Sequence, residues 1–196
     1  MQYALSLENN RILPEKGSDG ICPCCRQSCI PKCGNINIHH WAHITKDCDN
    51  WTEPETLWHK NWKNVFPVAT QETIIEKENV KHIADVQLGS GLVIEFQNSP
   101  LSLETMLERE SFYYNMIWIL NAEKWKDNVV FKDKGEYISF RWKHPRKCWW
   151  NSYKPIFWDF GEMFFQPKRI YDNIPCGGYG YFIDKQDFVT RLLRSN

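Results

Sequence analysis

A Cys/His-rich stretch constrains the fold of this chain more than any other feature. Residues 22–48 hold six cysteines and three histidines in 27 positions. This stretch is too polar to fold through apolar burial, so a bound metal ion would supply the missing stabilisation. Clustered cysteines in a chain without an export signal favour metal ligation over disulfides. The alternative is a group of surface thiols and histidines that holds no metal.

The spacing within this stretch predicts a tetrahedral Zn²⁺ site. Cys22 and Cys25 form a Cys-x2-Cys pair, the usual knuckle of a structural zinc site. His43 and Cys48 have usable spacing for the second pair, and His40 with His43 is the other candidate. The alternative ligands are His40, Cys24, Cys29 and Cys33. Because four protein ligands close the coordination sphere, we expect this zinc to have a structural role.

Length and composition suit one core domain with a small appended module. The chain has 196 residues, of which 42% are hydrophobic and 15% are aromatic, and this is enough to bury a core. No stretch approaches the roughly 20 apolar residues of a membrane span, and the N-terminus has no apolar signal core. We therefore expect a cytoplasmic protein without a membrane partner.

Periodic patterns predict the order of the structural elements. A short strand pair at residues 2–8 and 10–14 precedes the Cys/His stretch. Helices are expected at residues 53–66, capped by Thr52, at 101–114 and at 184–194. Strands are expected at residues 69–80, 81–88, 91–98, 115–122, 128–132, 136–142 and 155–158.

This order predicts an α/β fold in which a mixed sheet lies between helices. We expect residues 1–50 to form the strand pair and the zinc-binding module, and residues 51–125 to form the core domain. Residues 126–196 would add C-terminal strands and a helix, rich in basic residues and tryptophan, that pack on this core.

Two acids flank a Gly-Ser-Gly hairpin signal. Asp85 lies four residues before Gly89, and Glu95 lies four residues after Gly91. In a hairpin this offset brings the two acids nearly opposite each other, about 5 Å apart at Cβ. Carboxylates opposed among apolar neighbours repel, unless a hard divalent cation such as Mg²⁺ lies between them. Gln97 would emerge on the same face as Glu95. The alternative places both acids at exposed strand ends.

Seven short motifs follow one another over about residues 20–120. They are Cys22-x2-Cys25, HHWAH (39–43), Glu55-x3-His59-x3-Lys63, HIADV (82–86), IEFQNS (94–99), Arg109-x3-Tyr113 and IWIL (117–120). In this order they resemble the CoiA-like (competence protein) branch of the PD-(D/E)XK nucleases. Gln97 stands where the wider nuclease class has Lys, His82 replaces the usual Arg, and Trp41 replaces a Phe. The resemblance implies a PD-(D/E)XK core within residues 51–125.

The resemblance also assigns roles on two helices. Glu55 would add a further acid from the first helix, where His59 and Lys63 follow at one-turn intervals on the same face. Arg109 and Tyr113 could bind a phosphate. The alternatives are an exposed polar stripe on the first helix, and an Arg109 that pairs with Glu108 or Glu110 while Tyr113 packs in the core.

A basic, aromatic segment follows the proposed core. Residues 140–158 interleave Arg141 and Lys143 with tryptophans and tyrosine, a composition that suits phosphates and the exposed bases of single-stranded nucleic acid. Residues 1–120 hold 10 Lys and Arg against 15 Asp and Glu, while residues 121–196 hold 14 against 9, although the whole chain has zero net charge. The alternative is that the tryptophans fill a core and the charges are solvated.

These observations favour an Mg²⁺- or Mn²⁺-dependent nuclease that hydrolyses DNA, including single-stranded DNA. Asp85 and Glu95 would hold the metal with help from Glu55, and Gln97 would orient the attacking water. Lys63 or Arg109 would offset the charge that develops in the transition state. One alternative is a non-catalytic DNA-binding or adaptor protein that keeps the fold and the zinc knuckle. Another is a bare zinc-binding interaction module, which leaves the acidic pair unexplained.

Overall fold

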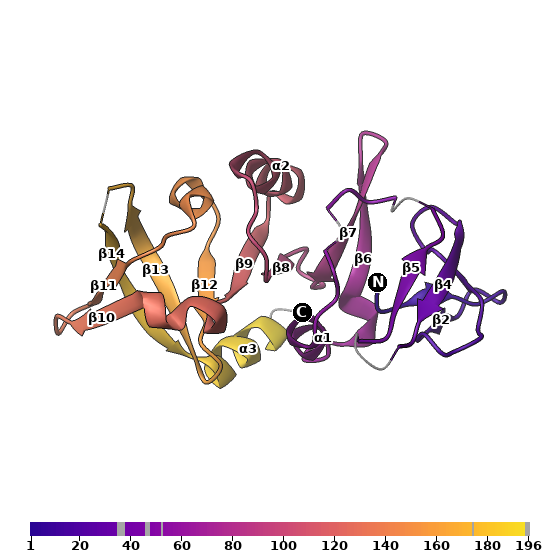
Figure 1. The fold of residues 1–196 in the computed structure, drawn as a ribbon, viewed down its shortest axis with the longest axis horizontal. Helices are drawn as coiled ribbons and strands as arrows, with labels where there is room; N and C mark the ends of the chain where they lie inside the picture. The colour runs from indigo at the N-terminus through magenta and orange to yellow at the C-terminus, as the bar shows by residue number, and fades with distance from the viewer. Residues whose placement is uncertain (35–37, 46–47, 52, 174, 195–196) are drawn as a thin grey trace. The chain divides into compact units, whose positions relative to one another are not determined.

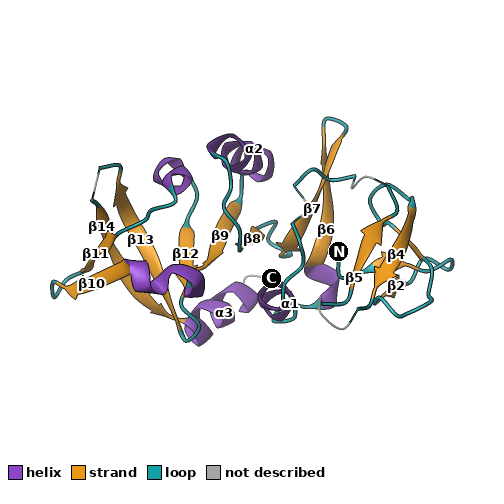
Figure 2. Cartoon of the chain, in the orientation of Figure 1, coloured by secondary structure: helices purple, strands orange, loops and turns teal. Residues whose placement is uncertain are grey.

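The chain forms two compact units. The computed structural model describes residues 1–34, 38–45, 48–51, 53–173 and 175–194. The first unit comprises Met1–Gln87 and the second comprises Leu88–Asn196 (Figure 1). Among the described residues of each unit, more lie in strands than in helices, and the helices are short (Figure 2).

A small antiparallel sheet carries the Cys/His stretch in the first unit. Its strands lie in the order β2-β1-β3-β4-β5 and are β1 (Ala4–Leu5), β2 (Arg11–Ile12), β3 (Gly20–Ile21), β4 (Ser28–Lys32) and β5 (His40–His43). The predicted strand pair is confirmed, because Ala4 pairs with Ile12. Trp41 packs over Gly20, where a Cβ would lie only 2.7 Å from the Trp41 ring. The indole therefore occupies the space that glycine leaves, in a core shared with Cys22 and Cys29.

A hairpin forms the rest of the first unit, preceded by helix α1 (Leu57–Lys63) and the short helix η1 (Val68–Thr70). Strands β6 (Gln71–Lys77) and β7 (Val80–Gln87) are antiparallel, with Ile74 opposite Ile83. Glu78 and Asn79 connect them with positive φ angles of 49° and 66°. Two such residues make the tight turn that matches strand twist. The predicted strand 69–80 therefore includes a turn that the alternating pattern did not reveal.

Helix α1 is shorter than the predicted helix 53–66. Its N-cap is Thr56, whose hydroxyl accepts a hydrogen bond from the backbone of His59. The predicted cap, Thr52, lies outside the described residues. Because Pro54 disfavours helical geometry in the residue before it, and Thr56 offers a capping oxygen, the helix begins one turn later than predicted. Glu55 consequently precedes the helix, which corrects its placement on a shared helix face.

The second unit is built on a large mixed sheet. Its strands lie in the order β10-β11-β14-β13-β12-β9-β8. They are β8 (Val93–Gln97), β9 (Met116–Asn121), β10 (Val129–Asp133), β11 (Ile138–Trp142), β12 (Ile156–Asp159), β13 (Met163–Tyr171) and β14 (Cys176–Asp184). The buried strand β9 runs parallel to both β8 and β12, whereas the remaining pairs are antiparallel. The α/β class with a mixed sheet is therefore confirmed.

The helices of the second unit follow the sequence patterns closely. Helix α2 (Leu103–Tyr113) begins at Ser102, whose hydroxyl accepts a hydrogen bond from the Thr105 backbone. Helix α3 (Lys185–Arg194) occupies the predicted terminal position. Two short 3-10 helices, η2 (Glu123–Asn128) and η3 (Lys147–Asn151), connect strands. No helix in the described ranges is long and apolar enough to cross a membrane.

The long hairpin of β13 and β14 was not predicted, because its sequence has the composition of a loop. It contains Pro167 at a register shift and glycines at 177, 178 and 180. A Cβ on Gly178 would lie 1.9 Å from the carbonyl oxygen of Arg169. Glycine is needed there because the two backbones approach too closely for any side chain.

Tryptophan rings fill the core of the second unit. Trp118, Trp142, Trp149 and Trp158 are fully buried. Trp125 stacks on Trp142 with ring centroids 4.6 Å apart. The sequence left open whether the aromatic rings of residues 140–158 stack on bases or fill a core. Trp142 and Trp149 pack in the core, whereas Tyr153 is exposed.

Candidate functional site

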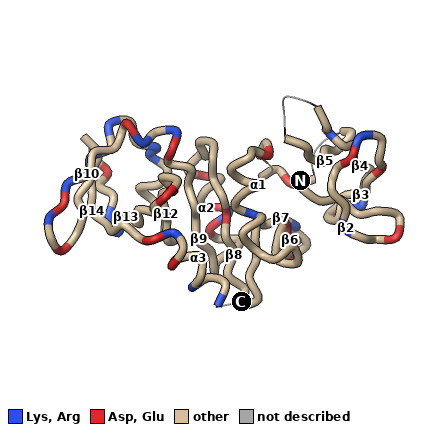
Figure 3. The backbone as a smooth tube through the Cα atoms, turned by 90° about the horizontal axis from the view of Figure 1, so that it is seen from below, with Lys and Arg blue, Asp and Glu red and all other residues tan. Residues whose placement is uncertain are grey.

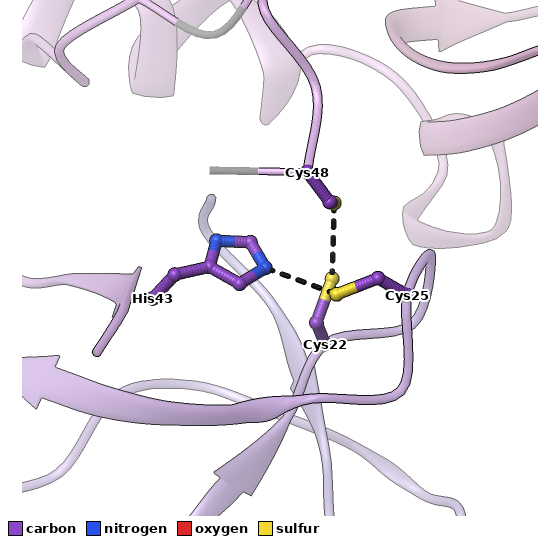
Figure 4. A group of neighbouring side chains, drawn as sticks. All are labelled: Cys22, Cys25, His43 and Cys48. Atoms are coloured by element: carbon purple, nitrogen blue, oxygen red, sulfur yellow. Dashed lines mark hydrogen bonds between the residues drawn. The ribbon is translucent and has the colours of Figure 1, made fainter. Parts of the chain in front are cut away.

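A cluster of three cysteines and one histidine lies in the first unit. Cys22 and Cys25 flank the turn after β3, His43 ends β5, and Cys48 follows on a separate segment (Figure 4). The four ligand atoms all lie within 4.8 Å of one another. These are the four residues that the spacing favoured, so the structure brings the predicted ligand set together.

The distances within the cluster fit a tetrahedral zinc ion. A Zn–S bond of ~2.3 Å gives a tetrahedron edge of ~3.8 Å. The Sγ atoms of Cys22 and Cys48 are 3.8 Å apart, and Cys25 Sγ lies 3.3 Å from His43 Nε2 (Figure 4). The backbone N–H of Cys24 points at Cys22 Sγ from 3.3 Å and would stabilise a thiolate there. The cluster could therefore hold Zn²⁺ in a closed site.

The alternative zinc ligands have other neighbours. Cys29 Sγ faces the carbonyl oxygen of Gln27, and Cys33 Sγ faces that of Pro14 at 3.4 Å. His40 Nδ1 lies 2.8 Å from the carbonyl oxygen of Ile38. Cys24 borders the cluster, because its backbone N–H points at Cys22 Sγ and its thiol has a hydrogen bond with Cys48. Among the described residues, the group that could hold a metal ion therefore consists of Cys22, Cys25, His43 and Cys48.

Thiols in this cluster differ in how readily they ionise. Burial, followed by the charges of Cys22 and Cys24, raises the pKa of Cys48 far above its ordinary range. Burial opposes ionisation of Cys25 as well, but hydrogen bonds from the Gln27 backbone and from His43 outweigh it and lower the pKa of Cys25. A cation is what would make all three thiolates favourable together.

Asp49 ties the cluster to strand β7. It directly follows the ligand Cys48 and is buried. One carboxylate oxygen lies 2.8 Å from His82 Nδ1, and the other accepts the backbone N–H of Ile83 at 2.7 Å. The ring of Trp51 stacks on His82 with centroids 3.3 Å apart. The segment that carries Cys48 is thus bonded to β7 two residues before Asp85, and His82 pairs with Asp49 in this link.

A buried ammonium organises a second cluster of charges in the first unit. Lys63 Nζ lies 2.8 Å from Glu55 Oε2 and 2.8 Å from Glu72 Oε1. Burial disfavours the charged amine, but the charges of Glu72, Glu55 and Asp85 outweigh it and raise the pKa of Lys63 above its ordinary range. Lys63 therefore stays cationic in the middle of three carboxyl groups. The predicted residues Glu55, Lys63 and Asp85 belong to this one cluster.

Glu72 is a member of this cluster that the sequence reasoning missed. Gln71 pairs with Val86 and Thr73 pairs with Ala84, so Glu72 occupies the position facing Asp85. Its carboxylate also accepts the backbone N–H groups of Gln2 and Tyr3 at 2.6 and 3.0 Å. Its φ of 46° is unusual for a residue with a side chain. The signal available in the sequence was the acid itself, in a strand next to Asp85.

His59 is buried, but it serves the start of helix α1. Its Nδ1 lies 2.8 Å from the hydroxyl of Thr56, which also accepts the His59 backbone N–H. The polar face of α1 is thus turned inward with Lys63, while Leu57 is exposed. The exposed polar stripe considered as an alternative is not what forms, and a catalytic role for His59 stays a prediction.

A second buried ion pair lies in the second unit. Arg109 Nη1 on α2 lies 3.1 Å from Glu95 Oε2 on β8, and both side chains are about 6% exposed. The ion pair is thus with Glu95, whereas the alternative considered for Arg109 was a pair with Glu108 or Glu110. Gln97 donates from Nε2 to the carbonyl oxygen of Ser99 at 2.8 Å. Tyr113 is buried, as its packing alternative predicted.

The predicted turn before Glu95 is present. Leu88 donates its N–H to the Leu92 carbonyl at 2.9 Å, Gly91 donates to the Leu88 carbonyl at 2.8 Å, and the φ of Gly91 is 79°. Glycine is needed at such an angle. Asp85 belongs to the first unit and Glu95 to the second, and their joint coordination of a cation stays a prediction.

Charged residues are interspersed along the backbone of both units (Figure 3). Arg141 on β11 and Lys143 just after it are exposed, as a role in phosphate binding requires. Their contact with DNA stays a prediction.

Comparison with known proteins identifies the N-terminal part. Residues 8–50 match the family described as "Competence protein CoiA, N-terminal domain". The match includes all four residues of the Cys/His cluster and confirms the resemblance over this segment. It associates the segment with a competence protein family. No curated protein matches the chain, and no solved structure matches it.

The cluster predicts which cysteines are needed for zinc. Cys48→Ser should lose the ion, because one of the four ligands is gone, whereas Cys33→Ser should keep it, because Cys33 Sγ faces Pro14 instead. Zinc per chain, measured by plasma mass spectrometry after dialysis, checks this. Equal zinc content in the two variants would contradict the assignment.

The Lys63–Glu72 pair predicts a pH dependence of stability. Burial opposes ionisation of Glu72, but Lys63 outweighs it and lowers the pKa of Glu72 from 4.5 to about 2. Below pH 4.5 the unfolded chain protonates this carboxyl first, so stability from the pair is full above pH 4.5 and is lost as pH falls toward 2.

The matched comparison is wild type against Glu72→Gln in urea unfolding at several pH values. The difference in unfolding free energy should be roughly 3 kcal/mol near neutral pH, as an upper bound, and should shrink between pH 4.5 and 2. A difference that does not change with pH would show that Glu72 contributes no charge interaction.

Proposed function

We propose that the protein is a metal-dependent nuclease that acts on DNA, with the competence-family segment at residues 8–50 as its structural zinc module. The wider fold would be a variant of the PD-(D/E)XK core in which Gln97 takes the place of the usual Lys. Processing or recombination of DNA would be its role, in keeping with the name of the matched family.

The observation that carries the proposal is an unsatisfied carboxylate oxygen. Glu55 Oε2 pairs with Lys63, but Glu55 Oε1 is buried and has no hydrogen-bond partner in the part of the chain that the structure describes. The Glu55 side chain is only 7% exposed. Leaving such an acceptor unpaired costs about 1–3 kcal/mol or more for a charged group. A bound cation would remove that cost.

The charge balance of the cluster supports the same conclusion. The three carboxyl groups of Glu55, Glu72 and Asp85 act on the ammonium of Lys63, and the N-terminal ammonium acts on Glu72 as well, so three acids face two cations. A buried excess of negative charge is unfavourable unless a cation compensates for it. Mg²⁺ needs only one or two protein carboxylates, because water and substrate phosphate complete its octahedral shell. Glu55 and Asp85 therefore fit the needs of such an ion.

In the proposal, Asp85 and Glu95 are the principal metal ligands and Glu55 assists them. Arg109 Nη1 holds Glu95 through Oε2. When bound, Mg²⁺ or Mn²⁺ would polarise the scissile phosphate and an attacking water. Gln97 would orient that water from its carbonyl end, since its amino end donates to Ser99.

The basic residues of the site have a different role from the one first expected. Lys63 and Arg109 each sit in a buried ion pair and orient a carboxylate. We therefore assign them as positioning residues for Glu55 and Glu95. Exposed cations, among them Arg141 and Lys143, would contact the DNA backbone.

A cleavage assay with matched variants tests the proposal. Asp85→Asn and Glu55→Gln keep the side-chain shape but remove a charged ligand, and the control Glu76→Gln alters an exposed acid on β6 that pairs with Lys81. With Mg²⁺ or Mn²⁺, wild type and the control should cut labelled DNA. Asp85→Asn should lose at least about 100-fold in rate, the range of one electrostatic catalytic contact. EDTA should abolish cutting.

Two outcomes would overturn the enzyme assignment. Cutting that persists equally in Asp85→Asn would show that the activity comes from elsewhere. DNA binding by all variants, without metal-dependent cutting by any of them, would establish the adaptor function instead. Thermal unfolding of each variant checks that the fold is intact.

A further inference from the structure

A groove in the second unit lies between the end of η3 with the segment that follows it and the second half of β13. It has a volume of about 650 Å³. Its walls come from residues 149–156 and residues 166–172. Three basic side chains line it, Lys154, Lys168 and Arg169, against a single acid, Asp172. The groove therefore suits an anionic ligand.

A second groove, of about 750 Å³, shares one lining residue with the first. Tyr171 belongs to both. The second groove is lined by the cations Lys132, Lys134 and Arg141, and no acid is among its lining residues. The two grooves together present six cations and one acid on either side of a tyrosine ring. This arrangement suits an extended polyanion better than a compact one.

Exposed aromatic rings accompany these cations. Tyr153 is 82% exposed and Tyr171 is 45% exposed, in a unit whose tryptophans are otherwise largely buried. Tyr114 is 75% exposed, and Lys154 Nζ lies 4.6 Å from the centre of its ring. Tyr114 also has a φ of 61°, which is rare and unfavourable for an aromatic residue. Exposed apolar rings and backbone strain of this kind concentrate at binding surfaces.

A buried carboxylate holds the exposed loop in place. Glu110 on α2 accepts hydrogen bonds from Trp118 Nε1 at 2.9 Å, from the Ser152 hydroxyl, and from the backbone N–H of Tyr153 at 2.9 Å. The backbone beneath Tyr153 is thus fixed while the ring extends into solvent. Because this backbone is already ordered, stacking of a ligand on the ring costs less conformational entropy than it would on a mobile loop.

We propose that the two grooves form a binding track for single-stranded DNA, with Tyr171 at their junction. Lys154, Lys168 and Arg169 contact the phosphates in the first groove, and Tyr153 and Tyr171 stack on unpaired bases. Paired bases are not available for stacking, so a duplex binds more weakly. The proposal rests on the proposed function only for the choice of DNA as the nucleic acid, because the binding itself needs no metal.

The test measures binding of fluorescein-labelled oligo(dT) by anisotropy with the zinc-loaded protein, in buffer without added Mg²⁺ or Mn²⁺ so that no cutting occurs. Tyr153→Ala and Tyr171→Ala should each weaken binding about ten-fold, the scale of one lost stacking contact. Tyr181→Ala is the matched control, since this tyrosine is also exposed in the second unit but lines neither groove. It should bind as wild type does.

The salt dependence tests the cations separately. Each phosphate contact on a single strand contributes about 0.7 to the slope of log affinity against log salt. The double variant Lys168→Ala with Arg169→Ala should therefore flatten that slope by roughly 1.4. Lys126→Ala, an exposed lysine on η2 outside both grooves, should leave the slope unchanged.

Equal binding by the two tyrosine variants and the Tyr181→Ala control would overturn the proposal. Equal affinity for a blunt duplex and for oligo(dT) would overturn it too. Failure of the nuclease assignment is distinguishable, because without added Mg²⁺ or Mn²⁺ Asp85→Asn should bind oligo(dT) as wild type does, whether or not wild type cuts DNA.

Discussion

In the first unit, the carboxylate of Asp49 links the segment that carries Cys48 to strand β7. It follows a zinc-site cysteine directly and accepts the backbone N–H of Ile83 on β7, while His82 lies against its other oxygen. One short bridge therefore connects a segment with little apolar surface to the strand that carries Asp85. If zinc holds Cys48, it also holds Asp49, and the position of β7 becomes sensitive to the metal. This gives the zinc module a structural reason to precede an acidic site.

The sequence predicts correctly those features that depend on residues close together along the chain. The zinc ligands, the capped helix α2 and the turn at Gly91 all depend on residues close together in the sequence. Glu72 escaped prediction because its importance comes from the register of β6 and β7 and from N–H groups about 70 positions away. The partner of Arg109 is likewise set by the packing of α2 on β8. The hairpin of β13 and β14 was missed because its glycines, needed for close backbone contact, resemble a loop.

Buried and exposed cations have different surroundings in this chain. Lys63 and Arg109 are enclosed with carboxylates, so they orient acidic groups and do not present free cations to a substrate. The cations that remain in contact with solvent lie elsewhere, and several of them line the two grooves of the second unit. The tryptophans of the same unit form its core, which leaves stacking on bases to the exposed tyrosines. The proposed chemistry and the proposed DNA binding thus use different residues.

Amide hydrogen exchange at Ile83 tests the link between the zinc cluster and β7 most directly. Its N–H donates to Asp49 Oδ2, so removal of zinc by chelation should speed its exchange. The Ala84 amide, on the neighbouring residue that pairs with Thr73 of β6, and the Ile119 amide on β9 report whether the units stay folded. The account predicts faster exchange at Ile83 with little change at the two controls. Unchanged protection of Ile83 after the zinc is gone would contradict it.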